Sequence, residues 1–168
     1  LRRNTRLKWR YEKMIKVLFI CHGNICRSTM AESVFTYLVT QAGLASHFEI
    51  NSAATSREEI GNPPHYGTVD KLRREHIPLI PHHARQMTAE DYRYYDYLIG
   101  MDTANIRNMT RIAGGADKEQ KIFNLLTFAG SGRDVADPWY TGDFDATFAD
   151  VMAGCSGFLE KIRREENI

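Results

Sequence analysis

The sequence predicts an α/β fold, in which a four-stranded parallel sheet is covered by helices on both faces to give three layers. Short apolar runs alternate along the chain with segments whose apolar residues recur at helical spacing. The first run, Val17 to Ile20, is apolar throughout, as expected of a parallel strand that is buried on both faces. A chain of 168 residues is long enough for one proper hydrophobic core.

A polar loop follows this first strand and leads into a helix whose apolar residues begin at Ala31. Such a strand–loop–helix turn points backbone N–H groups into one concavity, and the helix N-terminus adds partial positive charge. We therefore predict a phosphate-binding loop after strand 1. Its anion-binding residues are His22, Gly23, Asn24, Ile25, Cys26, Arg27 and Ser28.

Cys21 and Arg27 are the chemically active residues expected at this loop. Arg27 offers a planar fork of donors for two phosphate oxygens. Cys21 at the strand end would lie in an electropositive site, which favours the nucleophilic thiolate form. Gly23 permits close backbone approach, and Asn24 tolerates a left-handed conformation. The alternative from spacing alone is a buried structural cysteine beside an unrelated surface arginine.

The next elements follow in order. The first helix is expected to stop near Gly43, and a second strand at 48–52 follows it. Asn62 is expected to cap a helix that has Pro63 at its first position and ends near His76. An extended connection containing two further prolines then leads towards residue 88.

The second half has the same alternation. Thr88, followed by acidic residues, predicts a helix start. A third strand is expected at 97–101, a short helix at 103–112, a fourth strand at 121–123 and a loop at 129–139. The last helix is predicted by one apolar face, in which Cys155 is expected to be a core residue. This face consists of Phe144, Phe148, Val151, Met152, Cys155, Phe158, Leu159 and Ile162.

Composition excludes several classes of function. The formal net charge of +1 gives no global basis for binding nucleic acid, and no apolar run is long enough to predict a membrane partner. Three cysteines are too few for a disulfide framework and suit a cytoplasmic protein. Residues 1–13 form a basic extension that we expect to be disordered or expression-derived, with an arm for an acidic partner as the alternative. Residues 14–168 are expected to form a single domain.

The segment CHGNICRSTMAES after the first strand resembles the active-site loop of the low-molecular-weight protein tyrosine phosphatases, the acid phosphatase type. The resemblance extends from Met14 to Lys161 and includes SAATS, EIGNPP, ARQMTAEDY and DPWY. It implies hydrolysis of phosphotyrosine through a phosphocysteine intermediate, with Cys21 as the nucleophile and Arg27 as the phosphate ligand. It also implies that no metal or other cofactor is needed. The histidines lack zinc-ligand spacing.

The resemblance also assigns the general acid and base. The DPWY segment places this role on Asp137, and Trp139 and Tyr140 would form an aromatic wall of the substrate cleft. From the residues alone, an Asp-Pro pair is usually a turn. Asp134 is then the rival acid, and the two aromatic residues could belong to the core.

The family further implies a supporting network under the phosphate loop, made by Asn24, Ser28, Ser52 and His82. Asp102 matches the carboxylate that pairs with this histidine. Without the resemblance, His82 would be read as a surface residue.

Three positions depart from the family pattern. Thr29 stands where proline is common, and His22 stands where a small or aliphatic residue is frequent. Glu58 occupies the position where relatives often carry an aromatic residue that forms the second wall of the cleft. We therefore expect a charged wall opposite Trp139 and a changed substrate preference.

The expected partners are a phosphotyrosine-containing protein or a small aryl phosphate, with phosphate-type and sulfate-type anions as ligands. Three alternatives remain open. A thiol-dependent arsenate reductase would need two further cysteines, of which only Cys155 is left. A protein-arginine phosphatase would carry threonine in place of Ile25. A non-catalytic phosphate-binding module would lack the nucleophile or the acid.

Overall fold

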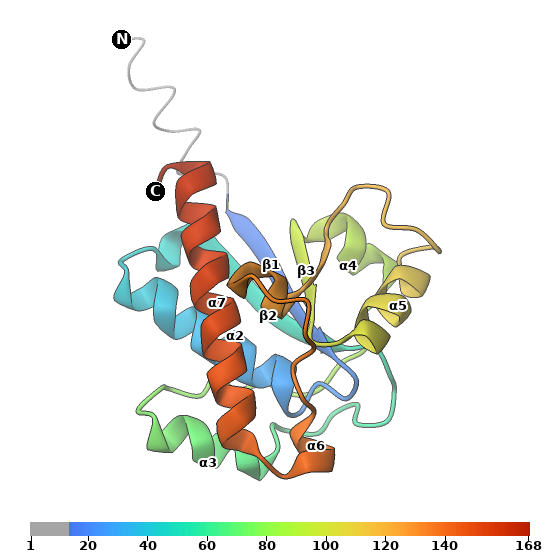
Figure 1. Ribbon diagram of the computed structural model, residues 1–168. Helices are drawn as coiled ribbons and strands as arrows, with labels where there is room; N and C mark the ends of the chain where they lie inside the picture. Colours follow the sequence, from blue (N-terminus) through green and yellow to red (C-terminus); the bar gives the residue numbers. More distant parts are fainter. Residues whose placement is uncertain (1–13) are drawn as a thin grey trace.

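The computed structural model describes residues 14–168, and the expectation for segment 1–13 lies outside the described residues. Its centre is a parallel sheet with the strand order β2-β1-β3-β4 (Figure 1). The predicted four-stranded parallel sheet is thereby confirmed. The strands are β1 (Ile15–Cys21), β2 (Phe48–Ala54), β3 (Tyr97–Gly100) and β4 (Ile122–Asn124).

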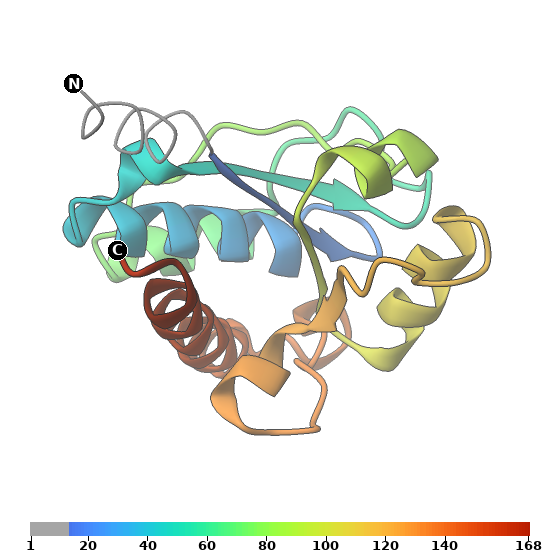
Figure 2. The same ribbon diagram turned by 90° about the horizontal axis from the view of Figure 1, so that it is seen from above.

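Helices cover both faces of this sheet. Figure 2 shows α2 and α7 on one side of the strands, and α4 lies on the other side. The α-helices are α2 (Arg27–Gln41), α3 (Tyr66–Arg74), α4 (Ala89–Tyr94), α5 (Thr103–Ile112), α6 (Pro138–Thr141) and α7 (Phe144–Glu166). Two 3-10 helices, η1 (Ala45–His47) and η2 (Leu125–Ala129), complete the fold.

The alternation of side chains along β1 explains its uniformly apolar sequence. Val17 and Phe19 pack into the core cluster that also contains residues of α2 and α7. Leu18 and Ile20 point the opposite way, into a second cluster with residues of α4 and α5. All four are fully buried. Because β1 is a central strand with helices on both faces, it has no polar face to present to solvent.

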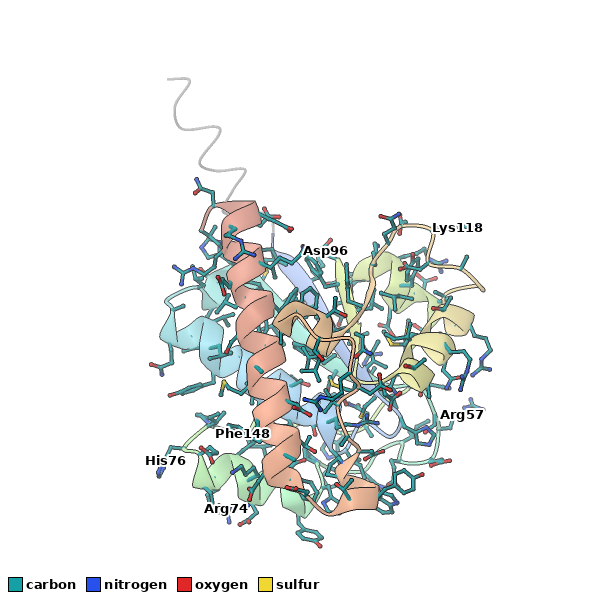
Figure 3. The ribbon with its side chains drawn as sticks, in the orientation of Figure 1. Arg57, Arg74, His76, Asp96, Lys118 and Phe148 are labelled. Carbon is teal, nitrogen blue, oxygen red and sulfur yellow. The ribbon has the colours of Figure 1, made fainter. Side chains whose placement is uncertain are left out.

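The apolar face predicted for the last helix is present on α7. Cys155 is fully buried there, and burial raises the pKa of its thiol. Phe148, labelled in Figure 3, lies under the ammonium group of Lys71 at 5.2 Å, a contact that connects α7 with α3. Among residues 14–168, no helix is both long and apolar enough to span a membrane.

The start of α3 differs from the sequence prediction. The cap is His65 rather than Asn62, and His65 Nδ1 accepts a hydrogen bond from Gly67 N at 3.0 Å. Asn62 instead donates from Nδ2 to Glu59 at 2.6 Å. Asn62 and Pro63 each precede a proline, and this position disfavours helical backbone. The helix therefore begins only at Tyr66.

Two other local predictions concern helix starts. Thr88 begins α4 with a capping box shared with Asp91, which confirms the expected start. The expected loop at 129–139 ends in the short helix α6, whose cap is Asp137 and whose first residue is Pro138. Proline suits the first turn of a helix because its missing N–H would have no partner there.

The carboxyl ends of the strands bring the polar loops together. Thr55 N, just after β2, donates to Cys21 O at 3.0 Å. Val135 N, from the long loop before α6, donates to Met101 O just after β3 at 2.8 Å. Three loops that are far apart in the sequence therefore meet at one edge of the sheet, which is where ligands bind in open α/β folds.

Candidate active site

One cavity of about 110 Å³ opens at this edge, and the residues expected to be catalytic line it together. Cys21 lies at the end of β1 and Arg27 at the start of α2, and both are almost fully buried. Asp137 reaches the same cavity from the loop before α6. The cavity is lined by Cys21, His22, Gly23, Ile25, Cys26, Arg27, Glu58, Glu59, Asp137, Trp139 and Tyr140.

The loop between β1 and α2 has the backbone that anion binding needs. Asn24 has a positive φ of 59°, in the left-handed region that asparagine tolerates. Glycine at position 23 leaves room for the side chain of Glu59, whose Cγ would lie 3.3 Å from a Cβ at this position. No side chain among residues 14–168 caps the N-terminus of α2. Its first N–H groups therefore remain available to an anion.

Three oxygen acceptors hold the Arg27 guanidinium in place. Its Nη1 donates to Asp102 Oδ2 at 2.8 Å and to Val135 O at 2.9 Å, and its Nη2 donates to Asp137 Oδ2 at 3.3 Å. These contacts fix the plane of the guanidinium while further N–H donors remain for phosphate oxygens.

The expected pairing of Asp102 with His82 is wrong. Asp102 follows β3, the neighbour of β1 in the sheet, and caps α5 by accepting from Asn105 N through Oδ1 at 2.7 Å. This cap directs its other oxygen towards Arg27, which becomes its partner. Asp102 thus orients the Arg27 guanidinium directly.

Asn24 is the centre of a buried network under the loop. Its Nδ2 donates to Ser28 Oγ at 2.8 Å and to Ser52 Oγ at 3.0 Å. Its Oδ1 accepts from His82 Nε2 at 2.7 Å and from Arg85 N at 3.2 Å. The structure thus brings together the four residues for which the family resemblance implied a network, and His82 is not a surface residue.

Ser28 connects this network to Cys21. Its Oγ lies 3.1 Å from Cys21 Sγ. Because Ser28 Oγ already accepts from Asn24, its own proton is free to point at the sulfur. The contact places a hydroxyl directly beside the sulfur.

Sequence reasoning missed Glu32, which lies under the same network. It is only 3% exposed, and its Oε1 accepts a hydrogen bond from Ser52 Oγ and lies 3.7 Å from His82 Nδ1. Burial raises the pKa of this carboxyl to about 7, against the opposing effects of the Ser52 hydrogen bond and the Arg85 charge. The available signal was its position four residues after Ser28, on the inner face of α2.

The two aspartates that competed for the role of general acid have different surroundings. Asp137 lines the cavity, caps α6 by accepting from Trp139 N at 3.0 Å, and contacts Arg27. Asp134 instead accepts from Thr103 N at 3.2 Å and from Asn124 Nδ2 at 3.0 Å. Asp134 therefore fastens its loop to α5 and β4, and it is not among the residues that line the cavity.

The cavity mouth has two unlike walls. Trp139 is 59% exposed and Tyr140 is 84% exposed, so the alternative that they are core residues is wrong. Glu58 and Glu59 add carboxylates to the lining of the same cavity. Glu58 Oε2 lies 2.9 Å from His22 Nε2, which joins the charged wall to the phosphate loop.

Cys26 is the second thiol of the cavity. Burial raises its pKa to about 12, with further contributions from the negative charges of Cys21 and Asp137. Cys26 is therefore held as a neutral thiol and does not compete as the nucleophile. In the described part of the chain, no group of three or more His, Cys, Asp or Glu side chains could hold a metal ion.

Comparisons with known proteins agree on one family. Residues 16–168 match the family described as low molecular weight phosphotyrosine protein phosphatase. The chain is 40% identical over 157 residues to the low molecular weight protein-tyrosine-phosphatase YfkJ of Bacillus subtilis. This alignment covers 92% of this chain and 100% of that protein. It is 39% identical over 149 residues to the human low molecular weight phosphotyrosine protein phosphatase. This second alignment covers 86% of this chain and 94% of that protein.

The fold of the chain also resembles a solved structure of this family. The crystal structure of Bacillus subtilis YfkJ superposes with a TM-score of 0.87 at 41% identity, covering 91% of this chain and 97% of that one. The family, the fold and the enzyme class predicted from the sequence are thereby confirmed. The chain belongs to the low molecular weight phosphotyrosine protein phosphatase family.

Proposed function

We propose that this protein hydrolyses phosphotyrosine in proteins, and small aryl phosphates, through a phosphocysteine intermediate on Cys21. The observation that supports this most is that Cys21, Arg27 and Asp137 line one cavity. A nucleophile, a phosphate ligand and a proton donor are the groups that the reaction needs. The members of the family named above carry the same activity in their names.

In the first step, the Cys21 thiolate attacks phosphorus and the bond from phosphorus to the phenolic oxygen breaks. Asp137, in its carboxylic acid form, gives its proton to the leaving oxygen, and phenol departs. Arg27 and the loop N–H groups bind the equatorial phosphate oxygens, where charge is concentrated in the transition state. The phosphoryl group then resides on sulfur.

In the second step, the Asp137 carboxylate accepts a proton from water, and the water oxygen attacks the phosphorus of phosphocysteine. The sulfur–phosphorus bond breaks, inorganic phosphate is released, and the thiolate of Cys21 is restored. Ser28, which lies 3.1 Å from the sulfur, stabilises the thiolate as the leaving group. The proposed reaction uses no metal or organic cofactor.

The mouth of the cavity suits an aromatic substrate. Trp139 and Tyr140 offer exposed ring faces, against which a phenyl ring packs well. A substrate protein would place its phosphotyrosine between these rings and Glu58. We place the enzyme in the cytoplasm, since its three cysteines are all free thiols and thiols persist in a reducing compartment.

The test is to measure kcat/KM of the wild-type enzyme for p-nitrophenyl phosphate and for matched phosphotyrosine and phosphoarginine peptides. We expect turnover of p-nitrophenyl phosphate and a clear preference for phosphotyrosine. Preferred hydrolysis of phosphoarginine would instead show that the protein is a protein-arginine phosphatase. Tight phosphate binding without turnover would make it a binding module.

A further inference from the structure

The charged wall of the cavity contains a contact between two exposed side chains. The side chain of Glu58 is 69% exposed and that of His22 is 51% exposed, yet Glu58 Oε2 and His22 Nε2 are 2.9 Å apart. Both residues line the cavity that holds Cys21. A carboxylate at the mouth of this cavity is in position to contact whatever flanks the phosphate group of a substrate.

The backbone reinforces this placement. Ser56 N and Ser56 Oγ both donate to His22 O, at 3.1 Å and 2.9 Å. Thr55 N donates to Cys21 O at 3.0 Å. The segment that carries Glu58 is therefore hydrogen-bonded to the phosphate loop itself.

The other charged residues near Glu58 differ from it in their burial, their contacts or the sign of their charge. Glu59 is partly buried, and Asn62 Nδ2 donates to its Oε2 at 2.6 Å. Arg57, labelled in Figure 3, is exposed. It has no ion-pair partner among residues 14–168. Asp137 contacts Arg27. Glu58 is thus the outward-facing carboxylate of this wall, and its Oε1 has no hydrogen-bond partner within the described residues.

We propose that Glu58, positioned by His22, determines specificity by binding a basic side chain next to the phosphotyrosine of a substrate. This inference rests on the proposed function and specifies its substrate class. A lysine or arginine beside the phosphotyrosine meets the carboxylate, whereas an acidic neighbour is repelled by it. Because the pair is exposed, the preference is modest and falls with added salt.

The test uses two phosphotyrosine peptides that differ only in carrying lysine or glutamate on both sides of the phosphotyrosine. Each kcat/KM is divided by the value of the same variant for p-nitrophenyl phosphate, so a general loss of activity cancels. We expect the wild type to favour the lysine peptide by about five- to tenfold, with a smaller ratio when NaCl rises from about 0.05 M to about 0.5 M. In Glu58→Gln the ratio should fall to within about twofold of unity.

The positioning role of His22 has its own readout. His22→Leu removes the partner of Glu58 and should lose most of the preference. His22→Gln keeps an N–H donor and should retain it. A full wild-type ratio in His22→Leu would mean that His22 does not position Glu58.

Arg57→Gln is the matched control, because it changes the charge of the same segment at an exposed side chain that has no ion-pair partner in the described chain. Its ratio should stay within about twofold of the wild type. If it changes the ratio as strongly as Glu58→Gln does, the net charge of the segment sets the preference and the role of Glu58 is refuted. A wild-type ratio of one with normal turnover refutes this inference alone, whereas no turnover of any substrate refutes the proposed function.

Discussion

The floor of this cavity, which is the buried network around Asn24, differs from its mouth in burial and in hydrogen bonding. On the floor, Asn24, Ser28 and Ser52 are fully buried, and each polar group has a hydrogen-bond partner. At the mouth, Glu58 and Tyr140 are largely exposed. The floor brings together the four residues of the implied network, although Asp102 pairs with Arg27 and not with His82. The mouth is where the sequence departs from the family pattern. We therefore expect substitutions in the buried part to affect the chemistry and substitutions in the exposed part to affect substrate choice.

The energies of the two regions explain this division. A buried polar group that loses its partner costs about 1–3 kcal/mol, so substitutions on the floor affect both stability and chemistry. An exposed ion pair contributes only about 0.2–1 kcal/mol, so substitutions at the mouth are tolerated by the fold. Changes at the mouth can therefore alter substrate preference while the reaction at Cys21 continues.

The largest effect should come from the nucleophile. We expect Cys21→Ser to reduce kcat by more than about 10⁴-fold, because an alcohol is far less ionised than a thiol. Fold and phosphate binding should persist, since the loop N–H groups and Arg27 remain. Circular dichroism and calorimetric titration with phosphate check these points, and turnover within tenfold of the wild type would refute the assignment.

Asp137→Ala should have the next largest effect. Loss of the general acid should slow phosphotyrosine hydrolysis by about 10²–10⁴-fold, and poor leaving groups should suffer more than good ones. Asp134→Ala is the matched control, because Asp134 bonds to Thr103 and Asn124 and does not line the cavity. If the leaving-group dependence appears in Asp134→Ala and is absent from Asp137→Ala, the two roles must be exchanged.

A substitution in the floor network should affect stability and rate together. Asn24→Ala removes four hydrogen bonds. It also places at a positive φ a residue whose side chain cannot form the local hydrogen bonds that let asparagine tolerate this conformation. We expect a loss of about 2–4 kcal/mol in the free energy of unfolding and a lower kcat. Urea titration measures the former. Asn108→Ala, on the partly exposed side of α5, should change neither by a comparable amount.

The smallest effect is expected at the mouth. Glu58→Tyr replaces the carboxylate with a ring in the cavity that Trp139 also lines. It should lower KM for neutral phosphotyrosine peptides by about two- to tenfold, because aromatic contacts are worth about 0.5–1.5 kcal/mol. Its kcat should change little. Steady-state kinetics would count against this account if kcat changed more than KM.

The sequence predicted those features that are encoded locally. The apolar run of β1, the loop that follows it and the apolar face of α7 are each continuous patterns within one segment, and all three are present. The start of α3 was misplaced because the effect of the two prolines outweighs the capping preference of Asn62.

The missed features join segments that are distant in the sequence. Asp102 pairs with Arg27, 75 residues away, because β3 lies beside β1. His22 and Glu58 are 36 residues apart. Glu32 looks like an ordinary helix residue until the fold buries it against Ser52. Such contacts follow from the order of strands in the sheet, which no local pattern specifies.

The central claim is that Cys21 carries the phosphoryl group, and trapping this intermediate tests it most directly. Asp137→Ala mixed with p-nitrophenyl phosphate, quenched in acid within milliseconds and digested, should yield the peptide containing Cys21 with the added mass of one phosphoryl group. One equivalent of p-nitrophenol per enzyme should appear in the same interval. A phosphoryl group on any other residue, Cys26 included, or steady turnover without a modified peptide, would contradict the account.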